Sequence, residues 1–365
     1  MNLPLHNKID ISSLEKLFSN MSESYKIFWF KAIIEKVHEG KKLLSYDELV
    51  NKMIADAWYM VAEYKLNLGP SDTLEKLVAY AYSQSGLLSN ASESTILNYL
   101  HSSKDLTLVS FKRTLVLNVP YRLQSPFLKD FTGSSWKGSL KSVANSINQT
   151  DGLIYKFDTV NGLNSTIIIT DIWFDYINTN YEIIKGWVDY NLIIYLQRRN
   201  PNIPGIPLKI TPPQERKLDK VKKYWSAIIE TTPIAEIYTG TIMEKSDISI
   251  DHFIPWSYVA HDELWNLSPT LKIINSSKNN NLPDWNMYFG RLCELEYIAY
   301  KLTQEKVVIR ELFEKCAREH INDPYVFHKL YTPNIEKYKF YSLLEETMLP
   351  IYTAAKNAGF NEWRL

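Results

Sequence analysis

The chain has 365 residues, of which 45% are hydrophobic and 22% charged, as in an ordinary soluble globular protein. Its length suggests two or three domains, and the absence of an 18-residue apolar stretch excludes a membrane span. Basic and acidic residues both number 41, giving a formal net charge of zero. That balance is unusual for a protein that binds DNA unaided, so we expect a partner or a local basic face to deliver any substrate.

The cellular compartment follows from the cysteines and the N-terminus. Two cysteines imply a reducing environment without a disulfide framework. Residues 1–8 contain no basic region leading into an apolar run, so we expect no signal peptide. The cytoplasm is therefore the expected location, with no membrane partner.

The first hundred residues have the pattern of a helical bundle. Ser45-Tyr46-Asp47-Glu48 is a good helix start, and Gly69-Pro70-Ser71-Asp72 ends one helix and caps the next. No catalytic constellation occurs here. We predict a helical N-terminal region, residues 1–104, that serves as a scaffold or partner surface.

Residues 105–212 change character and predict a mixed α/β region. Segments 106–111, 114–119 and 165–170 alternate in polarity as strands do, and a long helical pattern follows Asp171. The loop-like segment 120–141 interleaves basic residues with aromatics, which suits either a phosphate backbone or a solvated surface. Five prolines within residues 200–213 predict a linker or rigid loop at the end of this region.

A basic helix is predicted directly after the prolines, from Glu215 to about Ile229. Helical spacing places Arg216, Lys220 and Lys223 on one face. These three residues are candidates for nucleic-acid binding through phosphate contacts. A merely solvated face is the alternative.

Residues 248–283 form the stretch around which the chain is organised. Ile248, Ile250 and Phe253 bracket the pair Asp251-His252 in a short strand that Pro255 ends. A second short strand is expected at residues 265–267, stopped by Pro269, and a helix from about 270 to 281. Such a ββα unit can point Asp251 and His252 at Asn275 on the helix.

The residue types in this stretch suit phosphodiester hydrolysis. Asp251 and the side-chain oxygen of Asn275 are hard ligands that, with waters and a phosphate, suit Mg²⁺. His252 could deprotonate a water, because an unperturbed imidazole pKa of roughly 6.5 suits a general base near neutrality. Asn266 could hold the other ring nitrogen of His252 and fix its tautomer. Lys278, one turn beyond Asn275, could meet a phosphate.

This stretch resembles the HNH endonucleases, whose ββα-metal motif runs Asp-His, then Asn, then His or Asn followed three residues later by Lys. It is closest to the variant with Asn at the last position, which includes the HNH domains of RNA-guided CRISPR nucleases. The resemblance covers residues 234–285 and implies metal-dependent hydrolysis of nucleic acid, usually DNA. It implies Asp251 and Asn275 as metal ligands for Mg²⁺ or Mn²⁺, His252 as general base, and a supporting role for Asn266.

One departure concerns zinc. Many HNH proteins carry Cys-x-x-Cys pairs around the ββα unit, but the expected knuckle here reads Ile237-Tyr238-Thr239-Gly240. Cys293 and Cys316 alone cannot make a four-ligand site. We therefore expect no structural zinc and a hairpin held by packing. His261, in the loop, is expected to be an exposed polar residue rather than a ligand.

The predicted fold class is α+β and mainly helical. The four predicted regions are a helical one at 1–104, a mixed one at 105–212, the HNH nuclease domain at 213–290 and a helical C-terminal region at 291–365. The functional expectation is a DNA-cutting or DNA-nicking HNH endonuclease, set in a bacterial restriction or antiphage defence system with a partner protein or a homo-oligomer. The alternatives are a catalytically inactive HNH-derived module, an RNA substrate, and a self-contained restriction enzyme.

Overall fold

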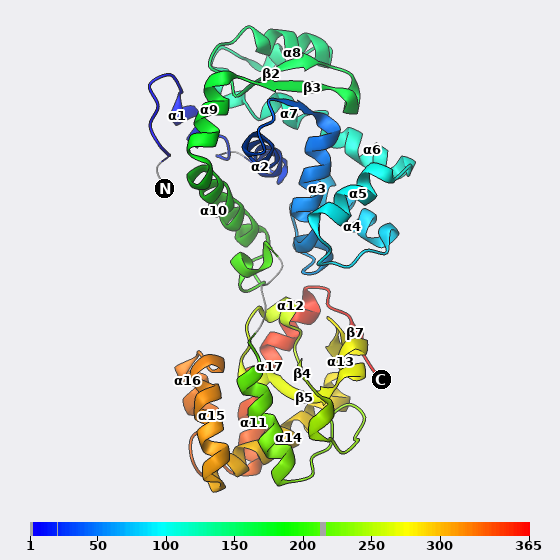
Figure 1. Ribbon diagram of the computed structural model, residues 1–365, viewed down its shortest axis with the longest axis vertical. Coiled ribbons are helices and arrows are strands. Elements are labelled where there is room, and N and C mark those ends of the chain that lie inside the picture. The colour runs from blue at the N-terminus through cyan, green and yellow to red at the C-terminus, as the bar shows by residue number, and fades with distance from the viewer. Residues whose placement is uncertain (1–2, 20, 212–216) are drawn as a thin grey trace. The chain divides into compact units, whose positions relative to one another are not determined.

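The computed structural model describes residues 3–19, 21–211 and 217–365 (Figure 1). The chain forms two compact units. The first takes in the described residues up to Pro201 together with Ile210 and Thr211, and the second takes in Asn202–Lys209 and the described residues from Lys217 to Leu365. The fold is mainly helical with a few small sheets, so the predicted α+β class is confirmed.

The first unit is a helical bundle with one small sheet. Its strands are β1 (Leu43–Ser45), β2 (Tyr155–Thr159) and β3 (Thr166–Ile169), joined antiparallel in the order β1-β3-β2. Because β1 pairs with β3, this unit takes in both the predicted helical region and the predicted mixed region. Its helices are α1 (Ile11–Glu15), α2 (Tyr25–His38), α3 (Tyr46–Ala62), α4 (Thr73–Ser85), α5 (Glu93–Ser102), α6 (Leu106–Leu115), α7 (Val119–Arg122), α8 (Leu140–Asn148), α9 (Asp171–Thr179) and α10 (Tyr181–Arg199).

The strands predicted within residues 106–119 are wrong, because α6 and α7 occupy this segment. The carboxylate of Asp105 accepts hydrogen bonds from the backbone of Thr107 and Leu108 and so caps α6. Leu108, Lys112 and Leu115 are buried on one face at helical spacing, whereas Leu106 is exposed. The strand predicted at 165–170 is confirmed as β3, at Thr166–Ile169.

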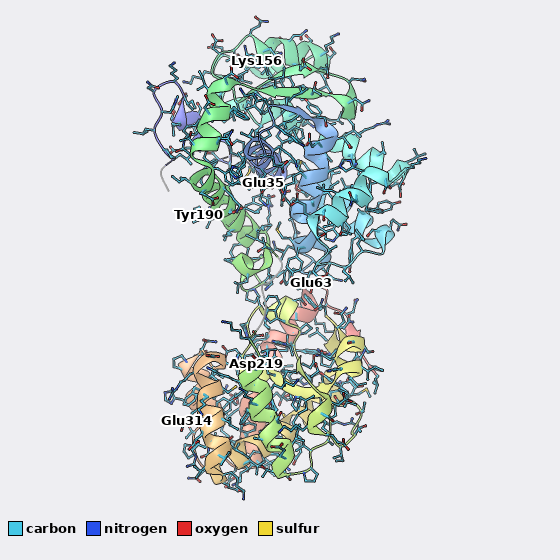
Figure 2. All side chains as sticks on the ribbon, in the orientation of Figure 1. Glu35, Glu63, Lys156, Tyr190, Asp219 and Glu314 are labelled. Carbon is cyan, nitrogen blue, oxygen red and sulfur yellow. The ribbon has the colours of Figure 1, made fainter. Side chains whose placement is uncertain are left out.

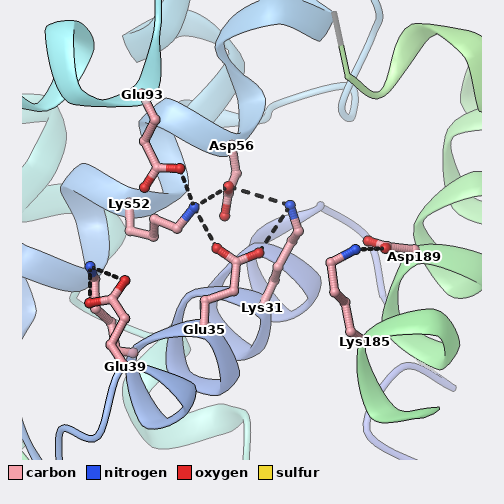
Figure 3. A network of polar contacts seen from close by, with 9 residues as sticks. Lys31, Glu35, Glu39, Lys52, Asp56, Glu93, Lys185 and Asp189 are labelled. Carbon is pink, nitrogen blue, oxygen red and sulfur yellow. Dashed lines mark hydrogen bonds and ion pairs between the residues drawn. The ribbon is translucent and has the colours of Figure 1, made fainter. Parts of the chain in front are cut away.

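A buried ionic network ties α2, α3 and α5 together in the first unit (Figure 3). Lys52 Nζ lies 2.7 Å from Asp56 Oδ1 and 3.1 Å from Glu93 Oε2, and it also pairs with Glu35. Burial by itself would lower the pKa of Lys52, but the carboxylates of Asp56 and Glu35 raise it above its ordinary value. Lys31 is the second cation of the network and lies 3.3 Å from Asp56. Each of these charges has a partner of opposite sign, so we assign the network a structural role.

The segment predicted either to follow a phosphate backbone or to be a solvated loop holds an internal contact. The guanidinium carbon of Arg122 lies 3.8 Å from the centroid of the Trp136 ring. Both readings of residues 120–141 remain predictions.

The second unit carries a small hairpin among helices. Its strands are β4 (Ile248–His252), β5 (Leu267–Leu271), β6 (Leu282–Pro283) and β7 (Glu362–Trp363). Its helices are α11 (Asp219–Thr231), α12 (Trp256–Val259), α13 (Lys272–Lys278), α14 (Trp285–Glu305), α15 (Val307–His320), α16 (Pro324–Leu330) and α17 (Lys337–Asn357). Figure 1 shows α15 and α16 on the side of α11 away from α13. β6 pairs parallel with β7, so the C-terminal residues lie beside the end of the ββα segment.

The second strand of the hairpin begins where it was expected to stop. Residues 264–266 form a 3₁₀ turn, and β5 follows, with Pro269 opposite Ile250 inside the ladder. A proline is tolerated there because each strand of a two-stranded sheet has an open edge, where a missing N–H costs little. Among the described residues, no helix is long and apolar enough to cross a membrane.

Candidate active site

A ββα unit positions the candidate residues. β4 and β5 pair antiparallel with Asp251 opposite Ser268 and His252 opposite Leu267, and α13 packs against both strands. The indole N–H of Trp225 donates to the carbonyl of Leu267 at 2.9 Å, which holds α11 against the hairpin. The strand end therefore carries the acid and the imidazole together, on a rigid support.

Asp251 is buried and held at both carboxylate oxygens. Tyr238 Oη donates to Oδ2 at 2.7 Å, and Lys278 Nζ lies 3.0 Å from Oδ1. Burial, and then the carboxylate of Asp251, raises the pKa of Tyr238 well above its ordinary value, so this hydroxyl stays a donor. The two contacts fix the carboxylate plane without using all of its lone pairs.

His252 is buried beside Asp251 and contacts an acid from the following loop. Its Nε2 lies 2.8 Å from Oδ1 of Asp262. The backbone carbonyl of His252 accepts a hydrogen bond from Lys278 Nζ at 2.7 Å. Lys278 thus braces both members of the Asp251-His252 pair.

Asn275 presents its amide oxygen as a candidate ligand. Its Nδ2 donates to Ser249 Oγ at 2.8 Å and to the carbonyl of Ile250 at 3.2 Å. These bonds orient the amide, and Oδ1 makes none of the described hydrogen bonds. Nδ2 holds the side chain on β4, next to the residue that precedes Asp251.

The donor set fits a hard divalent cation. Among residues 3–19, 21–211 and 217–365, no three His, Cys, Asp or Glu side chains group as they would in an all-protein metal cage. Carboxylate and amide oxygens are the ligand types that Mg²⁺ accepts when waters and phosphate complete its shell, so Asp251 and Asn275 stay the expected ligands. Cys293 and Cys316 are buried in α14 and α15, where burial raises both thiol pKa values to about 12.

Two candidate side chains make other contacts than the expected ones. Asn266 Oδ1 accepts from the Ile254 amide and its Nδ2 donates to the Ile254 carbonyl, both at 2.8 Å, so it clamps the turn after His252 rather than the imidazole. Asp262 contacts the ring instead. Lys278, expected to meet a phosphate, is fully buried and pairs with Asp251. A cation at this position compensates a buried carboxylate that would otherwise be costly.

A buried carboxylate organises the cysteine-free knuckle. Glu236 Oε2 accepts hydrogen bonds from the Tyr238 amide at 3.0 Å and from the Thr239 amide and hydroxyl at 2.7 and 2.8 Å. Its Oε1 accepts from Thr270 on β5 at 2.7 Å. Gly240 closes the turn with φ +77°, a conformation that favours glycine. The sequence reasoning missed Glu236, although an acid three residues before a threonine and followed by Gly240 is a recognisable turn signal.

The knuckle is also held from the C-terminal helices. Arg291 on α14 donates to the carbonyls of Ile237 and Tyr238 at 3.2 and 3.1 Å. The Tyr238 ring packs edge-on against Tyr288 and Trp363, with centroids 5.1 Å away in each case. Hydrogen bonds and aromatic packing therefore support the turn that places the Tyr238 hydroxyl next to the Asp251 carboxylate.

The basic helix is only partly described. Asp219, labelled in Figure 2, lies in the first turn of α11, and the predicted contact residue Arg216 lies outside the described residues. Lys220 pairs with Glu319 of α15, and Lys223 is exposed. The role of this face in nucleic-acid binding stays a prediction.

His261 differs from the exposed polar residue that was expected. It is largely buried, and its Nδ1 has none of the described hydrogen-bond partners. Burial, and then the neighbouring His252, lowers the pKa of His261 to about 4. The side chain is therefore neutral near pH 7.

Comparison with known proteins confirms the predicted family resemblance for this part of the chain. Residues 236–284 match the family model described as HNH endonuclease. No curated protein and no solved structure matches the chain. The matched segment runs from Glu236 through the knuckle, the hairpin and α13 to Asp284.

Proposed function

Starting from the HNH endonuclease unit at residues 236–284, we propose that this protein is a metal-dependent endonuclease that hydrolyses phosphodiester bonds in DNA. The observation that carries the proposal is the convergence of Asp251, His252 and Asn275 on one ββα support. Each has the chemistry that its position requires. The acid and amide oxygens are hard ligands, and the imidazole has a carboxylate partner.

The side chains divide the work of hydrolysis. Asp251 and Asn275 would hold Mg²⁺ or Mn²⁺, which when bound polarises the phosphate and stabilises the leaving oxygen. His252 takes a proton from a water, and the water oxygen forms the new bond to phosphorus as the bond to the leaving oxygen breaks. Lys278 and Tyr238 keep the Asp251 carboxylate in place during the reaction.

The biological setting we propose is the nuclease component of a bacterial restriction or antiphage defence system. The formal net charge of zero supports delivery or activation by a partner protein or by a second copy of the chain. One such site cuts one strand, so a double-strand break requires two sites or two successive nicks. We expect the helical first unit to serve as a scaffold or to carry the surface for such a partner.

The proposal is tested by converting supercoiled plasmid to nicked or linear DNA with Mg²⁺ or Mn²⁺, and with EDTA. Wild-type nicking should require metal and be abolished in His252→Ala, whereas His328→Ala, at an exposed position on α16, should cut normally. Asn275→Ala should raise the Mg²⁺ concentration needed for half-maximal cutting, because it removes one ligand.

The alternative is an HNH-derived module that binds nucleic acid or protein without cutting. Calorimetric titration with Mn²⁺ separates the two cases when wild type does not cut. Metal binding that is weakened in Asn275→Ala supports a nuclease that awaits an activator. Absence of metal binding would contradict the proposal that the protein is a metal-dependent nuclease.

A parallel assay on single-stranded RNA tests the alternative that the substrate is RNA. Binding to one DNA sequence without a partner would favour a self-contained restriction enzyme.

A further inference from the structure

We propose that Asp262 is a positioning residue that sets the ring tautomer of His252, so that Nδ1 is the nitrogen that accepts the proton from water. The inference rests on the proposed function, in which His252 is the general base. It adds a residue and an atom to that reaction. Asp262 lies in the loop between α12 and β5, outside the set of site residues that the sequence suggested.

The contact itself fixes the direction of the hydrogen bond. Asp262 Oδ1 lies 2.8 Å from His252 Nε2, a normal hydrogen-bond distance. An ionised carboxylate can only accept, so the ring must donate through Nε2–H. In a neutral imidazole the other nitrogen is then the acceptor, which makes Nδ1 the basic atom.

The loop that carries Asp262 is held by the end of α15. His320 Nδ1 lies 2.9 Å from the backbone carbonyl of Asp262, and since a carbonyl only accepts, His320 is the donor. Next to it, the buried carboxylate of Glu263 accepts from the backbone amide of Asn322 at 3.1 and 3.2 Å, and from its side chain at 2.7 Å. These contacts span about sixty residues of sequence and fix the loop against the C-terminal end of α15 and the residues just after it.

The start of the loop is fixed as well. The buried Lys209 donates to the carbonyl of Tyr258, in α12, at 2.7 Å. Ala260, which follows α12, has φ +56°, a left-handed conformation that ends the helix and turns the chain toward Asp262. Because both ends of the loop are anchored, Asp262 is held against the imidazole rather than placed there by a mobile side chain.

The structure thereby gives the C-terminal helical region a part in the site. His320 of α15 holds the backbone of Asp262, whose carboxylate contacts the imidazole. Arg291 of α14 holds the backbone of Tyr238, whose hydroxyl contacts Asp251. We expect the loss of such a partner to lower activity by about 10- to 100-fold, the range typical of residues that orient a metal-bound histidine.

The test reads the tautomer directly, with ¹⁵N NMR of the histidine-labelled, full-length protein. Spectra are recorded at a pH of about 8.5, two pH units above the ordinary imidazole pKa of about 6.5, and the His252 signals are assigned by their loss in His252→Gln. We expect wild type to show Nε2 protonated and Nδ1 unprotonated. In Asp262→Ala the two shifts should move toward each other as the tautomers exchange.

Asp247→Ala is the matched control, because Asp247 is exposed in the same unit and makes none of the described side-chain hydrogen bonds. It should leave the His252 spectrum unchanged. In DNA cleavage, Asp262→Ala should lower kcat by about 10- to 100-fold with little change in KM, since Asp262 acts on the base and not on substrate binding.

Two results would overturn the inference: a wild-type His252 protonated at Nδ1, or an Nε2–H tautomer that survives in Asp262→Ala. If the variant does not fold, the wild-type spectrum still overturns the inference when it shows Nδ1 protonated. If wild type cuts no DNA, the proposed function fails on that assay, while the tautomer measurement still decides what Asp262 does.

Discussion

The ammonium nitrogen of Lys278 lies 3.0 Å from Oδ1 of Asp251, and both side chains are almost completely buried. The same nitrogen binds the carbonyl of His252 at 2.7 Å. A lysine that was expected at a phosphate is thus part of the support beneath the Asp-His pair. This relationship makes the site an integral part of the core of the second unit.

Removing the cation should cost stability as well as activity. Lys278→Met leaves the Asp251 carboxylate buried and uncompensated, and we expect the free energy of unfolding to fall by about 3–5 kcal/mol in urea titrations. Lys301→Met, in an exposed pair with Glu305 on α14, is the control and should change it by at most about 1 kcal/mol. If the free energy of unfolding fell by a similarly small amount in both variants, the buried pair of Lys278 and Asp251 would not be needed for stability.

The partly buried His261 predicts a pH dependence of stability. Its pKa falls from the ordinary 6.5 to about 4 on folding, so between these values the unfolded chain binds more protons than the folded one. The contribution of neutral His261 to the free energy of unfolding is complete above pH 6.5 and is lost as the pH falls toward 4. Its size, allowing for partial exposure of the side chain, is about 2 kcal/mol.

His261→Gln removes this titration. When the pH is lowered from 8 to about 4, the free energy of unfolding should therefore fall less steeply in the variant than in wild type. If the free energy of unfolding depended on pH in the same way in both proteins, His261 would not be a group that folding keeps neutral.

The carboxylate of Glu236 should be essential for the knuckle. Glu236→Gln replaces an acceptor with an N–H₂ group that faces donors, and each buried group left unsatisfied costs about 1–3 kcal/mol. We expect a loss of that size in urea unfolding. The exposed Glu244→Gln is the control and should be neutral. Wild-type stability in Glu236→Gln would mean that packing alone holds the turn.

Removing metal ions with a chelator should abolish DNA cutting without destabilising the fold. Because Glu236 occupies the turn where a zinc knuckle would lie, EDTA should leave the urea midpoint unchanged, and elemental analysis should find no stoichiometric zinc. The same EDTA should abolish DNA cutting. A midpoint lowered by EDTA and restored by zinc would refute this view of the knuckle.

The basic face of α11 should contribute unequally to DNA binding. Lys223 is exposed, whereas Lys220 already pairs with Glu319. Lys223→Ala should weaken binding to any DNA sequence and reduce the slope of log K against log salt by about one, as for one phosphate contact. Lys220→Ala should have a smaller effect, measured by fluorescence anisotropy over a salt series. Equal behaviour of Lys223→Ala and Lys339→Ala, on α17, would exclude this face as the contact.

The sequence by itself determined where the candidate site lies and which residue types it contains. Asp251, His252, Asn275 and Lys278 lie within one contiguous ββα segment, where strand and helix periodicity and a few prolines are local signals. The family match at residues 236–284 confirms the predicted HNH resemblance, whereas the roles of the individual site residues stay predictions. The mainly helical class also followed from local patterns, but the alternation at 106–119 did not distinguish a strand from an amphipathic helix. Only the buried face of α6 decides that question.

The tertiary structure decided which side chains support that chemistry. Asp262 meets His252 because α15 holds its loop, and Glu236 reaches Thr270 across 34 residues. Lys278 turns inward because a buried carboxylate without a cation is costly. Contacts of this kind depend on burial and on segments far apart in the chain, whereas local sequence patterns record only which residues can form an element and which face of it is apolar.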